Sequence, residues 1–354
     1  MNKYFFGLIF ILFISCQTHH FKDKPSFWLW LTINNNYSDG DIDKAIKKIN
    51  HAGIKNIIVN TDSAGLEKII RKAVRYNIDV YAWFIALNRN DLAKAHPEWL
   101  SVNHQGKSLA EQKAYVDYYK FLCPAIPQVR DSIKDKIKSL CKIKELKGIH
   151  LDYIRYVDAI LPIGLWNKYN VVQDRVYPQF DYGYHPYLRQ KYQQKYGIDP
   201  LKIKDSEHDK QWNQFRLDQV TELVFQIDTI TKKYNKKLTA AVFPTPAMSA
   251  KMVYQDWGKW PLDIAFPMLY HNFYNENINW IGKMVEIDTS TSHHDTKIVA
   301  GFFVPNLKQP GKISKAVNTA LKNGAAGISF FGLNPLEDDT RWEEIAEVIK
   351  QNKS

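Results

Sequence analysis

The chain has 354 residues, 45% of them hydrophobic, which is enough for a large core in one α/β domain. Its 48 lysines and arginines outnumber 37 aspartates and glutamates, giving a formal net charge of +11. The lysines are spread over most of the predicted helices, and no nucleic-acid-binding motif accompanies them. Composition therefore favours a generally basic surface, and we expect no nucleic acid among the partners.

The N-terminal segment predicts export from the cytoplasm. A short positive start is followed by an apolar run, Tyr4 to Ile14, which has the length of a signal-peptide core and is too short to span a bilayer comfortably. The run ends at Cys16 and resembles a bacterial lipoprotein signal, in which the cysteine becomes the lipid-bearing first residue. An ordinary secretory signal with an unrelated cysteine is the alternative.

This reading divides the chain into three parts. We expect a signal peptide over residues 1–15, a tether over residues 16–25 that begins with the lipidated (palmitate-bearing) Cys16, and one domain over residues 26–350. The protein is then a monomer anchored to a membrane of the bacterial cell envelope, at the outer membrane or the periplasmic face. Cys123 precedes a predicted helix that contains Cys141, which separates the two by roughly 25 Å, so we expect two free thiols.

Strands and helices alternate along the domain. Short apolar runs predict strands at residues 26–33, 54–60, 78–86, the start of 148–156, 237–243, 262–270, 297–303 and 326–332. Helical spacing of apolar residues predicts helices at residues 41–52, 63–76, 125–146, 212–234, 249–259, 277–287, 312–323 and 342–350. Two long loops interrupt the rhythm, at residues 87–123 and 156–210.

This alternation predicts an α/β fold, a (β/α)8 TIM barrel with long loops after strands 3 and 4. An open doubly wound sheet is the alternative. A dinucleotide-binding sheet of that kind would need a Gly-rich phosphate loop after the first strand, and the sequence has none there.

The fourth strand carries polar residues on one face. Side chains alternate along a strand, so His150 and Asp152 point one way while Ile149 and Leu151 point the other. Active sites of these barrels lie at the carboxyl ends of the strands, and Asp152 ends the fourth strand, beside both long loops. Asp152 is therefore predicted to be a site residue. The alternative is that Asp152 and Arg155 form an ion pair that fastens a loop.

Other strand ends offer aromatic rings and hydrogen-bonding groups, a mixture that suits the apolar faces and hydroxyl rims of sugars. The predicted substrate-binding residues are Trp30, Asn88, His150, Tyr153, Arg155, Tyr156, Tyr270 and His271. Trp83 and Phe331 fit either this site or the barrel core. A metal site built from His150, Asp152 and His271 is a weaker alternative, because no closely spaced histidine pair supports it. We expect no cofactor and no metal.

Several motifs together resemble the glycosyl hydrolase-like 10 family, bacterial (β/α)8 barrels that are often lipoproteins. The motifs are Gly148-Ile149-His150-Leu151-Asp152-Tyr153-Ile154-Arg155-Tyr156, His96-Pro97-Glu98-Trp99-Leu100, Pro124 with Pro127-Gln128-Val129-Arg130, Gln255-Asp256-Trp257 with Trp260, and Asp263 with Pro267-Met268-Leu269-Tyr270. The resemblance implies hydrolysis of glycosidic bonds in a bacterial envelope glycan or another polysaccharide.

Glycoside hydrolysis generally needs two carboxylates. We expect Asp152 to be the ionised one, because Arg155 or His150 would lower its pKa. The second carboxylate is sought first at Glu337 and Asp62, on position alone, and then at three further residues, Asp158, Asp181 and Glu98. Two other classes stay open: a non-catalytic, surface-anchored glycan-binding lipoprotein, and an esterase or deacetylase acting on decorated sugars.

Overall fold

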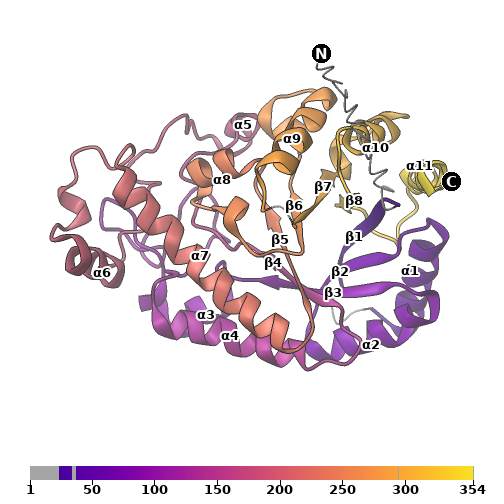
Figure 1. Cartoon of the computed structure of the whole chain (residues 1–354), viewed down its shortest axis with the longest axis horizontal. Helices are drawn as coiled ribbons and strands as arrows, with labels where there is room; N and C mark the ends of the chain where they lie inside the picture. Colours follow the sequence, from indigo (N-terminus) through magenta and orange to yellow (C-terminus); the bar gives the residue numbers. More distant parts are fainter. Residues whose placement is uncertain (1–23, 34–36, 294, 354) are drawn as a thin grey trace, which may run out of the picture.

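The computed structural model describes residues 24–33, 37–293 and 295–353. Its centre is a closed barrel of eight parallel strands in sequence order, with β8 paired to β1 (Figure 1). The strands are β1 (Ser26–Thr32), β2 (Asn56–Asn60), β3 (Asp79–Ile85), β4 (Gly148–Asp152), β5 (Lys237–Val242), β6 (Ile264–Pro267), β7 (Lys297–Phe303) and β8 (Gly327–Phe331). The predicted TIM barrel is confirmed. The predicted signal peptide, Cys16 and most of the tether lie outside the described residues.

One main helix follows each strand and covers the outside of the barrel. These helices are α1 (Asp39–His51), α2 (Ser63–Ala73), α4 (Pro127–Cys141), α7 (Lys210–Lys233), α8 (Pro246–Val253), α9 (Ile278–Thr291), α10 (Lys312–Lys322) and α11 (Arg341–Lys353). The β3–α4 connection contains α3 (Asn90–Ala95), and the β4–α7 connection contains α5 (Trp166–Tyr169) and α6 (Pro186–Tyr196). Figure 1 shows α6 extending away from the barrel, at the left.

The helices form where apolar spacing and caps agree. In α1, Ser38 accepts a hydrogen bond from the backbone N–H of Asp41, and the Asp41 carboxylate accepts one in return, so both ends of a capping box are present. The expected helix over residues 249–259 differs from the structure. α8 begins earlier, after the Thr245 cap, and ends at Val253 because Tyr254 adopts a left-handed backbone conformation with φ of 51°.

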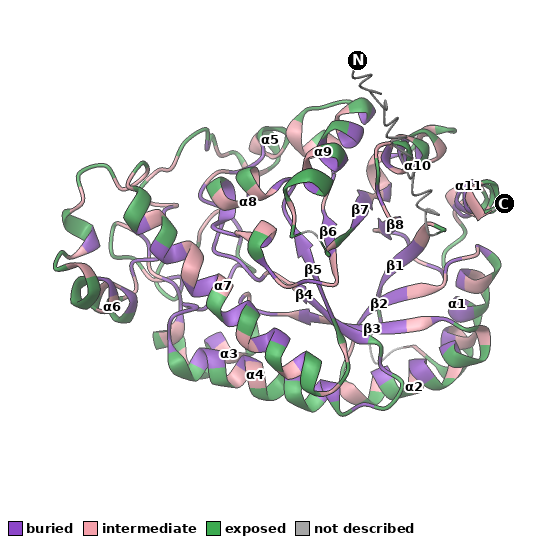
Figure 2. Cartoon of the chain, in the orientation of Figure 1, coloured by how far each residue is buried: buried purple, intermediate pink, exposed green. Residues whose placement is uncertain are grey.

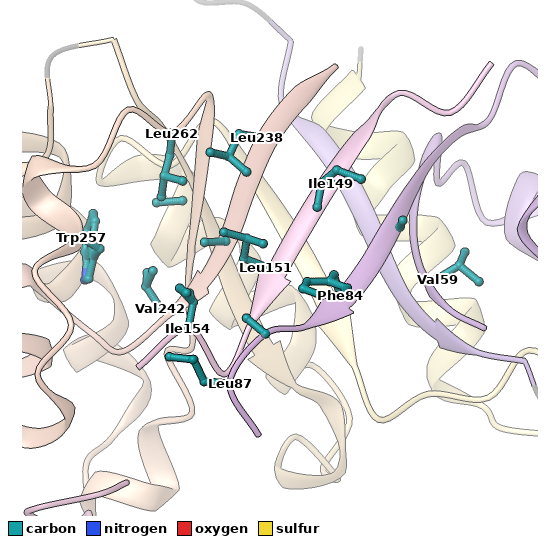
Figure 3. Packing of buried hydrophobic residues seen from close by; sticks show 14 of the residues in the cluster. Val59, Phe84, Leu87, Ile149, Leu151, Ile154, Leu238, Val242, Trp257 and Leu262 are labelled. Atoms are coloured by element: carbon teal, nitrogen blue, oxygen red, sulfur yellow. The ribbon is translucent and has the colours of Figure 1, made fainter. Parts of the chain in front are cut away.

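The strands bury side chains on both faces. Figure 2 accordingly colours most of the strand residues purple, as buried. The outward face of β4 carries Ile149 and Leu151, which pack with Leu238 and other apolar residues beneath the helices (Figure 3). The inward face meets a second cluster inside the barrel. That cluster consists of Trp28, Trp30, Ile58, Tyr81, Ala241, Phe266 and Val299, with Trp83 and Phe331 packed against it. The alternation predicted for the fourth strand is thus observed.

The ends of the described chain meet at the amino end of the barrel. The Lys24 ammonium donates a hydrogen bond to the Lys353 carbonyl oxygen at 2.7 Å. Cys123 and Cys141 are free and buried, as predicted, and burial raises the pKa of each thiol to about 11. Within residues 24–33, 37–293 and 295–353, no helix has the length and apolar character needed to cross a bilayer.

Candidate active site

A cavity of about 440 Å³ opens at the carboxyl ends of the strands. Its walls are mainly aromatic, and Asp152 is one of two carboxylates that line it among the described residues, with Asp158 as the other. The aromatic lining residues are Trp30, Trp83, Tyr115, Tyr118, Tyr119, Tyr153, Tyr169, Phe243, Tyr270, Phe273, Tyr274, Phe303 and Phe331. A cavity of this size and lining suits a small number of sugar rings.

The β4–α7 connection forms one wall of this cavity. Leu161, Pro162 and Leu165 line the cavity from this connection. Gly164, between them, packs directly on the turn that follows β6: a Cβ at Gly164 would lie 2.2 Å from the carbonyl oxygen of Asn272. Only glycine permits this approach, so the connection from β4 is held against the turn that follows β6, two strands further round the rim.

Asp152 is fixed by two hydrogen bonds at the end of β4. Its Oδ1 accepts from the backbone N–H of Tyr153 at 2.7 Å, and its Oδ2 accepts from Nε1 of Trp83 at 3.0 Å. Tyr153 has a positive φ of 51°, which ends the strand here. Burial raises the pKa of Asp152, while the two hydrogen bonds and Arg155 oppose the rise. We expected Arg155 or His150 to lower this pKa, and the net direction is the opposite.

His150 explains part of that difference. Its side chain points into the barrel below Asp152, where its ring lies 4.5 Å from the Trp30 ring, centroid to centroid, and Nδ1 lies 2.8 Å from Oγ1 of Thr239. Burial lowers the pKa of His150 to about 3, so the ring is neutral and supplies no positive charge. It belongs to the barrel interior and does not line the cavity.

Arg155 pairs with a different carboxylate. Its Nη1 lies 3.5 Å from Oδ1 of Asp158 and donates to the carbonyl oxygen of Tyr156 at 2.8 Å, while Nη2 donates to the Tyr119 hydroxyl at 3.3 Å. The guanidinium also lies over the ring of Phe243, at 5.0 Å from the centroid. The ion pair that fastens this loop is therefore Arg155 with Asp158, and the alternative in which Arg155 pairs with Asp152 is wrong.

Asp158 also holds a tyrosine. Its Oδ2 accepts a short hydrogen bond from the hydroxyl of Tyr115, whose oxygen lies 3.2 Å from the hydroxyl oxygen of Tyr119. Asp158 is 2% exposed, whereas Tyr115 is partly exposed. The long connections after β3 and β4 thus meet in one polar cluster at the cavity wall.

The structure brings together only part of the predicted site. Trp30, Tyr153, Arg155 and Tyr270 line the cavity with Asp152. Trp83 and Phe331, which fitted either the site or the core, do both.

Both leading candidates for the second carboxylate lie outside this cavity. Asp62 is exposed and caps α2 by accepting a hydrogen bond from the Gly65 N–H at 2.7 Å. Glu337 is exposed and accepts one from Nδ2 of Asn334 at 2.8 Å. Each side chain is turned to a local backbone or side-chain donor, so neither joins Asp152.

Three predicted binding residues also lie elsewhere. Asn88 accepts a hydrogen bond from the Lys120 N–H at 2.7 Å and lines a separate groove beside β2 and β3. Tyr156 is 1% exposed and packs against the ring of Tyr254. His271 lines a second hollow, between the connections that follow β6 and β7.

Sequence reasoning missed the tyrosines of the β3–α4 connection. Tyr115, Tyr118 and Tyr119 line the cavity although they lie about thirty residues beyond the end of β3. The available signal was their density, because four aromatic residues fall within residues 115–121.

In the described part of the chain, no three histidine, cysteine or acidic side chains are grouped closely enough to hold a metal ion. The alternative site of His150, Asp152 and His271 is thus not assembled.

Comparison with solved structures finds the same barrel fold in several proteins. A beta-galactosidase from the psychrophilic Marinomonas ef1 has a TM-score of 0.63 at 11% identity, over 92% of this chain and 59% of its own. The catalytic domain of a beta-amylase from Paenibacillus polymyxa has a TM-score of 0.60 at 10% identity, over 93% of this chain and 99% of its own. An endo-beta-1,4-mannanase from Thermotoga petrophila has a TM-score of 0.55 at 11% identity, over 93% and 77%.

These identities establish the fold alone, and this chain spans less than two thirds of the beta-galactosidase. Among curated proteins, none matches the sequence. The family model of Glycosyl hydrolase-like 10 matches residues 45–162, which include β2 to β4 and Asp152. The chain therefore carries the fold of TIM-barrel glycoside hydrolases and, over residues 45–162, matches the family that its motifs indicated.

Proposed function

We propose that this protein hydrolyses glycosidic bonds of a bacterial envelope glycan or another polysaccharide, with Asp152 as a catalytic carboxylate. The observation that carries the proposal is the position of Asp152, at the end of β4 in an aromatic cavity, with its pKa raised by burial. The match to the glycosyl hydrolase-like family supports the reaction class.

The geometry favours the acid role for Asp152. A general acid must hold its proton until the glycosidic oxygen departs, and a buried carboxyl with a raised pKa does so at higher pH than an exposed one. The N–H groups of Trp83 and Tyr153 fix both oxygens and stabilise the carboxylate that remains after proton transfer. The surrounding rings would stack on sugar faces and exclude water.

The envelope location rests on sequence alone. A lipid on Cys16 would tether the domain to a membrane of the envelope, and envelope glycans are the polymers within reach of such a tether. Labelling of cells with a radioactive or clickable palmitate tests this part, because Cys16→Ser would remove the label and release the protein. A monomeric barrel is the simplest form, and size-exclusion chromatography with light scattering measures it.

The activity is tested by reducing-end release from a panel of glycans. The panel contains peptidoglycan strands stripped of stem peptides, chitooligosaccharides, β-mannan, β-galactan and starch, each incubated with the chain from Gln17 onward. We expect cleavage of at least one glycan, and Asp152→Asn should lower turnover about 10²- to 10⁴-fold. The matched control is Asp62→Asn, which makes the same chemical change outside the cavity and keeps a residue that caps helices well.

A glycan-binding protein without activity is the second candidate. One observation favours it: the other carboxylate of the cavity, Asp158, is already bonded to Tyr115 and paired with Arg155. Isothermal titration with the same glycans separates the two. Binding by both the wild type and Asp152→Asn, without cleavage by either, would replace the hydrolase with a receptor.

A further inference from the structure

Glycosidic hydrolysis at this site needs a second group besides Asp152. Most glycosidases use a second carboxylate, but a tyrosine serves as the nucleophile in some. In this cavity the second carboxylate, Asp158, is 2% exposed and its oxygens face protein groups. A sugar would have to displace those groups before it could contact Asp158 directly.

Tyr115, which is bonded to Asp158, is better placed than Asp158 to contact a sugar in the cavity. Tyr115 lines the cavity, is partly exposed, and donates its hydroxyl proton to Oδ2 of Asp158. The Arg155 guanidinium lies on the other oxygen, Oδ1, at 3.5 Å, and it donates a shorter hydrogen bond, 2.8 Å, to the Tyr156 carbonyl. The oxygen that faces Tyr115 is Oδ2, and the Arg155 guanidinium pairs with the other oxygen of the same carboxylate.

We propose that Tyr115 is the nucleophile of this site and that Asp158 is the base that takes its proton. The proposal rests on the proposed glycosidase function and deepens it. It assigns a retaining, two-step reaction, because a covalent glycosyl-tyrosine forms on one face of the sugar and water then displaces it from the other. Asp152 serves as the acid in the first step and as the base in the second.

The two steps balance without any further reactant. In the first, the Tyr115 oxygen bonds to the anomeric carbon, its proton passes to Asp158, the glycosidic C–O bond breaks and the leaving oxygen takes the proton of Asp152. In the second, water bonds to the anomeric carbon, its proton passes to Asp152, and the C–O bond to Tyr115 breaks. The phenolate then recovers its proton from Asp158, and all three groups return to their starting states.

The surroundings fit this division of labour. Burial and the nearby Asp158 carboxylate raise the pKa of Tyr115 well above its usual range, so the hydroxyl stays protonated until attack begins. A neutral hydroxyl can rest against an apolar cavity wall at lower cost than a free carboxylate. Tyr119, which lies 3.2 Å from the Tyr115 hydroxyl and accepts from Arg155, keeps the ring in place.

The alternative is a purely structural role, in which Tyr115, Asp158 and Arg155 join two loops. The experiment therefore uses Tyr115→Phe and Asp158→Asn, with the panel glycan that the wild type cleaves fastest as substrate. The matched control is Tyr192→Phe in α6, which removes from a buried tyrosine outside the cavity the hydroxyl that donates to Oε1 of Gln211 at 3.2 Å.

We expect Tyr115→Phe to lower kcat at least about 10²-fold, and Asp158→Asn to lower it comparably, while Tyr192→Phe keeps wild-type turnover. Proton NMR of the first product should show a retained anomer. Acid quenching of the wild type during turnover, followed by peptide mass mapping, should place a glycosyl group on Tyr115.

Three results would overturn the assignment: an inverted anomer, a glycosyl group on a carboxylate, or Tyr115→Phe turnover within tenfold of the wild type. The anomer and the mapped adduct come from the wild type, so they decide the matter even if a variant fails to fold. Absence of any cleavage by the wild type would remove the proposed function together with this assignment. Cleavage that survives Tyr115→Phe would remove the assignment alone.

Discussion

The rim of the barrel has two unlike halves. After β3 and β4 the connections are long, and they carry Arg155, Asp158 and several tyrosines of the cavity, among them Tyr115. After β5 to β8 the connections are shorter, and that half contributes mainly rings, such as Phe243 and Phe331. The first half thus supplies a carboxylate and a cation, and the second supplies mostly aromatic rings; in the proposed function the rings would be the surface on which a sugar lies.

Each half also buries a carboxylate, and the two are neutralised differently. Asp158 lies beside Arg155. Asp288, on α9, is 0% exposed; its Oδ1 accepts a hydrogen bond from the Thr245 N–H at 3.1 Å, and its Oδ2 has no hydrogen-bond partner within the described residues. Burial raises the pKa of Asp288 to about 8, so this carboxyl is held neutral by its own proton.

The largest expected effect comes from removing Arg155, the cation in the half of the rim that follows β3 and β4. Arg155→Met should leave Asp158 buried without its partner and lower the free energy of unfolding by about 3–5 kcal/mol. Urea denaturation measures the loss. The double variant Arg155→Met with Asp158→Asn should recover part of it, and a loss below about 1 kcal/mol in the single variant would show that the pair contributes little.

The carboxylate of the apolar half should instead make stability depend on pH. Asp288 has a folded-state pKa of about 8 and an unfolded value near 3.8, so the folded state holds more protons between these values. The stability of the wild type therefore falls, by up to about 1.4 kcal/mol per pH unit, as pH rises through that window. The difference in free energy of unfolding between Asp288→Asn and the wild type should therefore shift in favour of the variant, with the same slope, as pH rises. If the free energies of unfolding of the two proteins changed in parallel between pH 5 and 8, the raised pKa of Asp288 would be refuted.

Trp83 contacts both Asp152 and the ring of Phe331, and it should influence the pKa of Asp152. Trp83→Phe removes a hydrogen-bond donor that favours the ionised form of Asp152, so the pKa of Asp152 rises further. The alkaline limb of kcat/KM should move upward by about one pH unit. Trp166→Phe, which removes an indole hydrogen bond to the Leu161 carbonyl, is the matched control and should leave the limb in place. A downward movement in Trp83→Phe would contradict the acid role.

The smallest effect is expected on the ring-lined side. Phe331→Leu keeps the apolar character of the wall but removes a ring that stacks with Tyr270, at 6.3 Å between centroids. Loss of stacking on a sugar should raise KM about two- to tenfold and leave kcat nearly unchanged. Steady-state kinetics on the preferred glycan measure both constants. A fall in kcat without a change in KM would place chemistry in the half to which we assign only binding.

The barrel and the orientation of the side chains of β4 could be predicted from sequence because both follow from short-range patterns. Eight apolar runs between helical patterns require a parallel sheet, and alternation along β4 orients Ile149 outward and Asp152 toward the cavity. The direction in which a side chain turns after a strand is a different matter. Asp62 and Glu337 follow β2 and β8 closely in sequence, yet each is captured by a nearby donor.

The polar cluster of the cavity had no such local signal. Tyr115 and Asp158 come from two irregular connections, 43 positions apart in sequence, and their contact exists only after both connections have folded over the rim. The same holds for the pKa of Asp152, since it depends on burial by residues from several strands and loops. The sequence could offer Asp158 as one of several acidic candidates, but it could not indicate that Tyr115 is its partner.

The contact between Lys24 and Lys353 has a practical consequence. Both described ends lie at the amino end of the barrel, and the cavity opens at the carboxyl end, so anything attached to either end holds the cavity facing away from the attachment. A bead or chip coupled at either end would leave the cavity open to long insoluble polymers. The two ends are also close enough for a short linker to join them, so a circular permutant opened in a distant loop should assemble the same barrel.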